Sequence, residues 1–341
     1  LNPEAVNHIS ELGGTVLASS RGPEDPAEMV DYLQELGIGI LFAIGGDGTL
    51  KGAGAINAEA RRRGLPLSVI GIPKTIDNDL AVTDHCPGYG SAAKFVAQAF
   101  AGVNLDNRAI PGVYIGVVMG RHAGFLTAAA SLGKKYPDDG PHLIYVPEAP
   151  ISRKQFVNDV KAVYAKYKRC IIAVSEGIRD TKGNVIGEQF TGGEKCGHGH
   201  RQLSGTGALG DYLASWIRLG TKIERVRADT LGYLQRSFLG CVSEVDQFEA
   251  RGVGEKAAQY AIWHNRDGSV AIRRVGDYAV EFFLTNLKSV AGKEKTMPKS
   301  FINRSGNGVT ESFRKYALPL IGNLPEIARL AAPKVDKVLN K

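Results

Sequence analysis

The stretches IGGDGTLKGA (Ile44–Ala53) and GIPKTIDNDL (Gly71–Leu80) decide the fold of this chain. An unbroken apolar run, 38–44, leads into the first, and a second expected buried strand, 67–72, apolar except for Ser68, leads into the second. Runs without polar alternation are typical of parallel strands that are covered on both faces. We therefore expect two neighbouring parallel strands whose polar loops meet at the carboxyl edge of one sheet, where α/β proteins bind ligands.

The residue types in these loops suit phosphoryl transfer. Their glycines let backbone N–H groups approach phosphate oxygens, and a helix that begins after the first loop adds a favourable dipole. Asp47 and Asp79 are suitable ligands for hydrated Mg²⁺, and Asp77 could accept the proton of an alcohol. Lys74 offers a point positive charge beside the transferring group. Asp-Gly and Asp-Asn are also common turn residues, but two such loops after successive buried strands favour a phosphoryl-transfer centre.

Strands and helices alternate along the remaining chain. Strands are expected near 113–119, 143–146, 171–174 and 223–226, with helices at 92–103, 152–168 and 206–219. This alternation predicts parallel sheets wrapped by helices, an α/β fold. A length of 341 residues suits two such domains. A short helix is expected at 3–12, a short strand at 15–18, and a solvated surface loop at 288–299.

Composition narrows the class of protein. The formal charge of +7 comes from 42 Lys and Arg against 35 Asp and Glu, and the basic residues are scattered. That pattern fits anionic substrates such as phosphates, and no basic-aromatic pattern indicates nucleic acid. The sequence contains no apolar run of about 18 residues, the length that would predict a membrane-spanning helix. The four cysteines are widely spaced, which argues against disulfides and favours a cytoplasmic location.

Two further loops carry candidate site residues. Arg21 follows the expected strand 15–18 and is a candidate phosphate contact, with a solvated loop arginine as the alternative. The segment CGHGH (Cys196–His200) offers three metal ligands at alternate positions but no fourth, so a flexible loop is favoured there.

The segment PKTIDND (Pro73–Asp79) closely resembles the PxTIDND motif of the 6-phosphofructokinase family. The resemblance continues in the right order over nearly the whole chain, through MGR (119–121), SEG (175–177), Arg227 and LGYLQR (231–236). The GGDGT sequence alone would also fit the kinases of NAD and diacylglycerol, but those lack the TIDND loop.

This resemblance implies two Rossmann-like three-layer domains with mainly parallel sheets and an active site in the cleft between them. The donor domain would comprise 1–88 plus 236–300, and the fructose 6-phosphate domain 89–235 plus 301–341. The family's first strand and glycine-rich donor loop would precede Leu1. A homodimer or homotetramer is expected, although Gly112 stands where short bacterial members carry an inter-subunit arginine.

The resemblance also implies residue roles. The residue matching Asp77 is the general base for the sugar 1-hydroxyl, and those matching Asp47 and Asp79 serve Mg²⁺. The implied catalytic set is Asp77, Arg121, Lys74 and Thr75. The implied donor-binding set is Arg21, Gly46, Asp47, Gly48, Thr49 and Lys51. The implied substrate-binding set is Thr75, Asp77, Asp79, Met119, Gly120, Arg121, Glu176, Arg227, Tyr233 and Arg236.

Two positions resemble selectors of the phosphoryl donor. Glycine at Gly48 leaves room for a nucleotide, whereas aspartate there would crowd and repel an α-phosphate. Lysine at position 74 is typical of pyrophosphate-dependent members. The combination of Gly48 with Lys74, however, resembles the long ATP-dependent branch. We expect a glycolytic enzyme that transfers the γ-phosphate of ATP to the 1-hydroxyl of fructose 6-phosphate, with pyrophosphate as the alternative donor. An NAD or diacylglycerol kinase and a non-catalytic sugar-phosphate-binding subunit are more distant alternatives.

Overall fold

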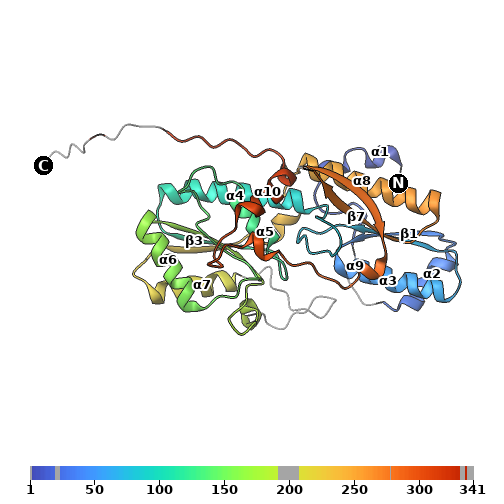
Figure 1. Ribbon diagram of the computed structural model, residues 1–341, viewed down its shortest axis with the longest axis horizontal. Helices are drawn as coiled ribbons and strands as arrows, with labels where there is room; N and C mark the ends of the chain where they lie inside the picture. The colour runs from blue at the N-terminus through green and yellow to red at the C-terminus, as the bar shows by residue number, and fades with distance from the viewer. Residues whose placement is uncertain (1, 20–23, 191–206, 277, 331–334, 336–341) are drawn as a thin grey trace.

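The computed structural model describes residues 2–19, 24–190, 207–276, 278–330 and 335, and they form two α/β lobes side by side (Figure 1). Each lobe is built on a four-stranded sheet, with strand order β1-β2-β7-β8 in one and β4-β5-β3-β6 in the other. Every strand pair is parallel except β7 with β8. The predicted α/β fold with mainly parallel sheets is therefore confirmed.

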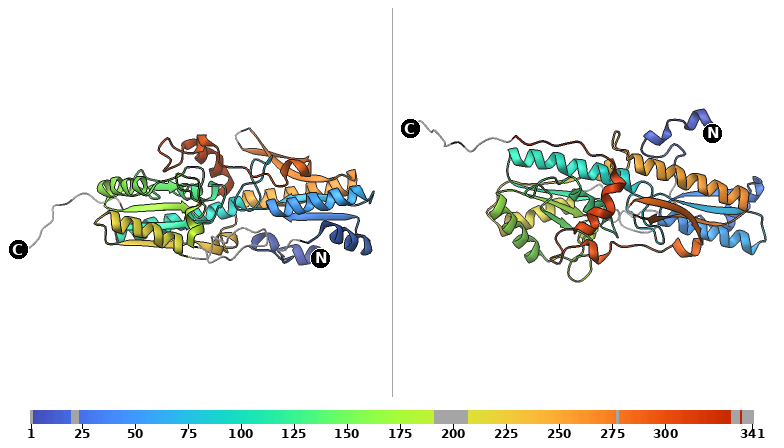
Figure 2. Two further views of the ribbon diagram at one scale, coloured as in Figure 1. Left: turned by 90° about the horizontal axis from the view of Figure 1, so that it is seen from below. Right: turned by 45° about the horizontal axis from the view of Figure 1, so that its top comes forward.

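The first lobe takes strands from both halves of the chain. Its elements are α2 (Pro26–Glu35), β1 (Ile40–Gly45), α3 (Asp47–Arg62), β2 (Ser68–Pro73), α8 (Glu244–His264), β7 (Gly268–Val275), β8 (Ala279–Thr285) and α9 (Leu287–Val290). Helices α3 and α8 lie on opposite faces of the sheet, as Figure 2 shows. Apolar side chains of α8 pack on β2 and β7, and those of α3 pack on the other face.

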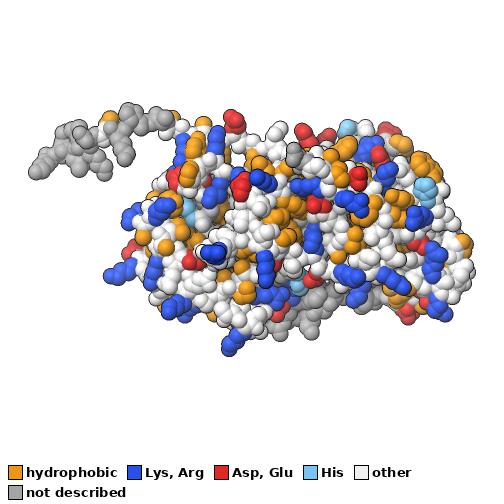
Figure 3. Space-filling model, in the orientation of Figure 1, with side chains coloured by type: hydrophobic (Ala, Val, Ile, Leu, Met, Phe, Trp, Pro, Cys, Tyr) orange, Lys and Arg blue, Asp and Glu red, His pale blue; other side chains and the backbone are white. Residues whose placement is uncertain are grey.

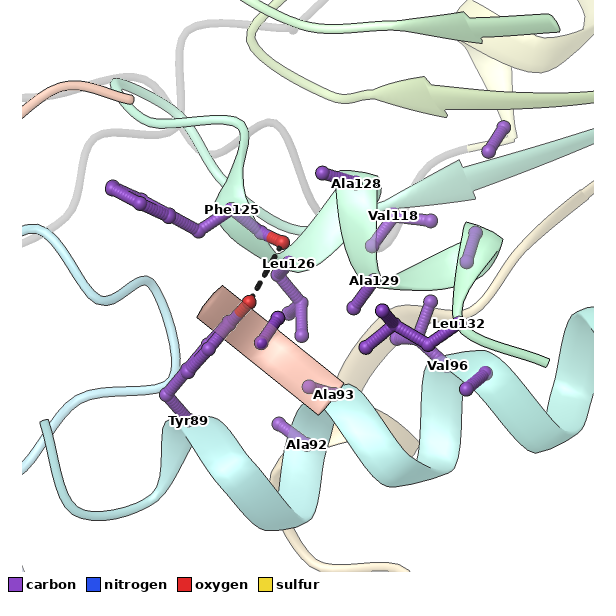
Figure 4. Packing of buried hydrophobic residues seen from close by; sticks show 14 of the residues in the cluster. Tyr89, Ala92, Ala93, Val96, Val118, Phe125, Leu126, Ala128, Ala129 and Leu132 are labelled. Carbon is purple, nitrogen blue, oxygen red and sulfur yellow. Dashed lines mark hydrogen bonds between the residues drawn. The ribbon is translucent and has the colours of Figure 1, made fainter. Parts of the chain in front are cut away.

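The second lobe has an all-parallel sheet. Its elements are α4 (Tyr89–Ala109), β3 (Val113–Val118), α5 (Phe125–Ala128), β4 (Leu143–Tyr145), α6 (Arg153–Tyr167), β5 (Cys170–Ser175), α7 (Ala208–Gly220), β6 (Val226–Thr230) and α10 (Glu311–Ala317). Every residue of β5 is buried, as expected for a central parallel strand. Figure 4 shows small residues of α4 against α5, where the Tyr89 hydroxyl donates to the Phe125 carbonyl at 3.2 Å.

The remaining elements are single turns. They are α1 (Pro3–Val6) and the 3₁₀ turns Ile9–Glu11, Ala129–Ser131, Ile186–Phe190, Gly232–Arg236, Lys299–Phe301 and Leu318–Ile321. None of the helices in the described part of the chain could span a membrane. Basic side chains are spread over both lobes on the face seen in Figure 3, in keeping with the scattered charge of the sequence.

Three sequence predictions need correction. The stretch 15–18 forms a turn with exposed side chains because no strand in the described part of the chain pairs with it. The helix expected at 3–12 is reduced to two short turns. One face of β1 is open, with Ile40, Phe42 and Ile44 between 37% and 44% exposed, because α8 covers β2 and β7 instead.

Candidate functional site

The two predicted loops lie next to each other at the carboxyl edge of the first sheet. Strands β1 and β2 end in register at Gly45 and Pro73, and the Lys74 N–H donates to the Gly45 carbonyl at 3.0 Å. A Cβ on Gly45 would lie 2.3 Å from the Thr49 hydroxyl oxygen, so only glycine allows α3 to start this close to the strand. Helix α3 begins at Asp47, which places this carboxylate at the helix N-terminus.

The TIDND loop is tied to its surroundings by Thr75. The Thr75 hydroxyl accepts the Asp77 N–H at 3.1 Å, and the Thr75 N–H donates to the Pro87 carbonyl at 3.1 Å. Thr75 also forms an isolated bridge with Gly88, at the start of α4. The loop that carries Asp77 is thereby fastened to the helix that leads into the second lobe.

In the second lobe, predicted site residues lie in loops at the carboxyl ends of two strands: the MGR motif follows β3, and the SEG motif begins at the end of β5. The Ser175 hydroxyl donates to the Gly120 carbonyl, and a Cβ on Gly177 would lie 2.0 Å from the Arg121 carbonyl oxygen. The Met119 N–H donates to the side-chain oxygen of Gln235 at 3.1 Å. The MGR motif is therefore in direct contact with both the SEG and the LGYLQR motifs.

Electrostatic coupling shows that residues from both lobes share one region. Burial raises the pKa of Asp77 to about 7, the charge of Asp79 adds to this, and Arg236 opposes it. Burial likewise raises the pKa of Glu176 to about 7, and the next contribution is the charge of Asp77. The pKa of Asp79 is raised by burial and by the charges of Glu294 and Asp47. The site thus holds a carboxyl group that titrates near neutrality, which suits a general base.

The side chains of Asp47 and Asp79 fit a hydrated Mg²⁺. Each is only partly buried, and their charges act on each other. One carboxylate oxygen of Asp47 accepts the Gly292 N–H at 2.9 Å. No cluster of three or more potential metal ligands occurs in the described part of the chain. Mg²⁺ commonly keeps several waters and uses one or two carboxylates, so this donor set is adequate.

The segment 291–297 crosses both loops, and sequence reasoning missed it. The Lys295 N–H donates to the Asp79 carbonyl at 2.6 Å, and Glu294 forms a bridge with Leu80. The Lys295 ammonium group donates to the carbonyls of residues 83 and 84 at 3.0 and 2.7 Å. The prediction that 288–299 is wholly a solvated loop is therefore wrong at Lys295, and no periodicity in this lysine-rich stretch could have indicated the contact.

The other proposed site residues differ in their surroundings. The Arg121 guanidinium donates to Glu188 at 2.7 Å. The Arg236 guanidinium lies 5.0 Å from the ring centroid of Tyr233, a side chain that is 52% exposed. Among the proposed site residues, the exposed ones are Thr49, Lys51, Lys74, Arg227, Tyr233 and Arg236. Arg21 and the CGHGH segment lie outside the described residues.

Comparison with known proteins identifies similar chains. This chain is 54% identical over 338 residues to the pyrophosphate--fructose 6-phosphate 1-phosphotransferase of Rhodospirillum rubrum, covering 98% of this chain and 84% of that protein. The crystal structure of a pyrophosphate-dependent phosphofructokinase from Marinobacter aquaeolei matches 99% of this chain and 84% of its own, with a TM-score of 0.82 and 29% identity. An ATP-dependent 6-phosphofructokinase of Trypanosoma brucei brucei is 40% identical over 56% of this chain and 38% of its own length.

These findings correct the donor expected from Gly48. The Rhodospirillum rubrum and Marinobacter aquaeolei proteins, which match nearly the whole chain, are named for pyrophosphate, whereas the ATP-dependent enzyme of Trypanosoma brucei brucei matches little more than half of it. The expectation of an ATP-dependent enzyme is therefore wrong. The family itself is confirmed: the phosphofructokinase family model matches residues 1–261, and the chain belongs to the phosphofructokinase family.

Proposed function

We propose that this protein transfers a phosphoryl group from pyrophosphate to the 1-hydroxyl of fructose 6-phosphate. The observation that carries the proposal is the 54% identity, over 98% of the chain, to a protein named for this reaction. The site independently supports activation of the acceptor hydroxyl, because Asp77, whose pKa is raised to about 7, interacts electrostatically with Arg236 and Glu176 of the second lobe.

The acceptor oxygen requires a base, and Asp77 fills this role. The 1-hydroxyl oxygen attacks the nearer phosphorus of pyrophosphate, and the bond from that phosphorus to the bridging oxygen breaks, releasing inorganic phosphate. The hydroxyl proton passes to Asp77, which is largely deprotonated above its pKa. Burial beside Asp79 keeps this pKa high enough for the carboxylate to be an effective proton acceptor at neutral pH.

The remaining residues bind and orient the reactants. Asp47 and Asp79 would hold Mg²⁺, which neutralises phosphoryl oxygens when bound. Arg121 would balance charge on the transferring group, together with Lys74 and Thr75 of the loop that follows β2. Arginine forks suit a dianionic phosphate, so we assign Arg227 and Arg236 to the 6-phosphate of the sugar. The other assigned sugar-binding residues are Met119, Gly120, Glu176 and Tyr233. We assign the donor phosphates to the first loop, at Gly46, Gly48, Thr49 and Lys51.

A coupled assay of fructose 1,6-bisphosphate formation tests the proposal. The purified protein is given fructose 6-phosphate and Mg²⁺ with either pyrophosphate or ATP, and EDTA is added in a parallel series. We expect turnover with pyrophosphate that EDTA abolishes and excess Mg²⁺ restores. Absence of fructose 6-phosphate-dependent turnover with pyrophosphate would refute the assignment.

A further inference from the structure

Asn78 has an unusual position between the two acidic residues of the TIDND loop. Its φ angle is +58°, in the left-handed region, and its side chain is fully buried. Among residues other than glycine, asparagine adopts this conformation most readily, yet it still carries a cost. Such a conformation persists where surrounding contacts hold it in place.

Two hydrogen bonds hold the Asn78 side chain, and a third holds the tyrosine that makes one of them. Its carbonyl oxygen accepts the Cys86 N–H at 3.0 Å, and its NH₂ group donates to the Tyr316 hydroxyl at 2.8 Å. The Tyr316 hydroxyl in turn donates to the Asp84 carbonyl at 2.8 Å. The loop that carries Asp77 is therefore connected through one tyrosine hydroxyl to helix α10, 238 residues later in the chain.

Tyr316 is itself fixed by its neighbours. Its ring centroid lies 6.0 Å from that of Phe125 and 5.2 Å from that of Phe301. The Arg274 guanidinium lies 4.8 Å from the ring centroid and donates to the Tyr316 carbonyl at 2.9 Å. Phe125 opens α5, directly after the loop that carries Arg121. The tyrosine thus contacts both the TIDND loop and the element behind the Arg121 loop.

We propose that Tyr316 is a positioning residue that acts through Asn78 to fix the directions of the Asp77 and Asp79 carboxylates. The backbone turns sharply at a left-handed residue, so a change at Asn78 reorients the residues on either side of it. Small displacements of a base from its reacting hydroxyl reduce rates steeply, about 100-fold for 1 Å. The inference rests on the proposed function only for the role of Asp77 and not for the hydrogen bonds themselves.

The test combines Tyr316→Phe, Asn78→Gly and the double variant. Tyr316→Phe removes only the hydroxyl, and Asn78→Gly keeps a residue that tolerates φ of +58° while deleting both side-chain bonds. Tyr145→Phe is the matched control, because it removes a buried tyrosine hydroxyl that donates to Asp159 at 2.9 Å in the second lobe. We measure kcat, KM for fructose 6-phosphate, and hydrogen exchange of the peptide spanning 75–84.

Tyr316→Phe and Asn78→Gly should each lower kcat about 10- to 100-fold, with KM changed less than about twofold. The double variant should be no slower than the worse single variant, because both changes break one connection. Exchange at 75–84 should accelerate in these variants and stay unchanged in Tyr145→Phe, whose kcat should also be unchanged. If Tyr316→Phe does not fold, Asn78→Gly gives the same readouts.

Two results would overturn the positioning role. One is a wild-type kcat together with wild-type exchange in Tyr316→Phe. The other is losses that multiply in the double variant. An inactive wild-type protein would refute the proposed function instead, and the exchange rates at 75–84 would still decide whether Tyr316 holds the loop.

Discussion

Replacing Asp77 by asparagine should slow catalysis about 10²- to 10⁴-fold, the usual contribution of a positioned general base. KM for fructose 6-phosphate should change little, because an amide occupies nearly the same volume. The pH dependence gives the sharper test. With a pKa of about 7 for Asp77, the deprotonated fraction falls from about 0.9 at pH 8 to about 0.1 at pH 6. In the wild-type protein kcat/KM should therefore fall about tenfold between these pH values.

The same raised pKa makes a prediction about stability. A carboxyl group whose pKa is raised from 3.8 to about 7 on folding stabilises the folded state fully below pH 3.8, and this contribution is lost as the pH rises through 7. The upper limit of this contribution to folding stability, set by the size of the pKa shift, is about 4 kcal/mol. The actual contribution is smaller, because the Asp77 carboxylate is only partly buried and solvent screens it. Asp77→Asn should thus be more stable than wild type at about pH 8, by about 1–3 kcal/mol, with little difference at about pH 4.

Stopped assays between about pH 5 and pH 9, together with urea unfolding at the two pH values, measure both effects. A rate near wild type in Asp77→Asn would remove this residue from its role as base. An acidic limb of kcat/KM that persists in the variant would assign the titration to another group, such as a substrate phosphate. Equal stability of the two proteins at pH 8 would contradict the raised pKa.

Three further predictions concern other contacts of the site. Glu176→Gln removes a charge that interacts with Asp77. The acidic limb of the kcat/KM profile should therefore move by up to about one pH unit to lower pH, while KM for fructose 6-phosphate rises. An unmoved limb would contradict the coupling. Lys295→Met should lower the free energy of unfolding by about 1–3 kcal/mol, because it leaves the carbonyls of residues 83 and 84 unpaired. Lys293→Met, at an exposed position, should change this free energy by less than about 0.5 kcal/mol. Equal effects would refute the buried role of Lys295. Gly177→Ala should lower kcat at least about 100-fold, because its Cβ would meet the Arg121 carbonyl. Gly254→Ala is the control: its Cβ would have nothing within 4 Å, and the change should stabilise α8 by about 1 kcal/mol. An active Gly177→Ala variant would show that the loops carrying Gly177 and Arg121 need not touch.

The sequence was most informative where a pattern has a direct geometric consequence. Apolar runs before Gly45 and Pro73 predicted two parallel neighbours, and the observed register brings their loops together. Strands β3, β4 and β5 fall within a few residues of their predicted positions for the same reason. Strand β6 begins at Val226, later than expected, because pairing with Val113 sets its start.

Contacts between segments far apart in the chain left no such pattern. Nothing in the sequence around Lys295 or Tyr316 indicates a partner more than 200 residues away. The open face of β1 was also unpredictable, because an apolar run shows that a strand can be covered but not that a helix covers it.

The donor prediction failed for a related reason. Gly48 removes a steric and electrostatic obstacle to a nucleotide, but the absence of an obstacle supplies no binding contact. One residue of a loop therefore carries little information on whether the rest of the donor site holds a nucleoside or only phosphate. The resemblance had implied pyrophosphate at the second position, Lys74, and the two relatives reported above that match nearly the whole chain are named for that donor.

The most direct test of this account is the ratio of kcat/KM for pyrophosphate to that for ATP, measured with saturating fructose 6-phosphate and Mg²⁺. We predict fructose 1,6-bisphosphate formation with pyrophosphate at a kcat/KM at least about tenfold above that with ATP. A kcat/KM for ATP that equals or exceeds the value for pyrophosphate would contradict the proposed donor.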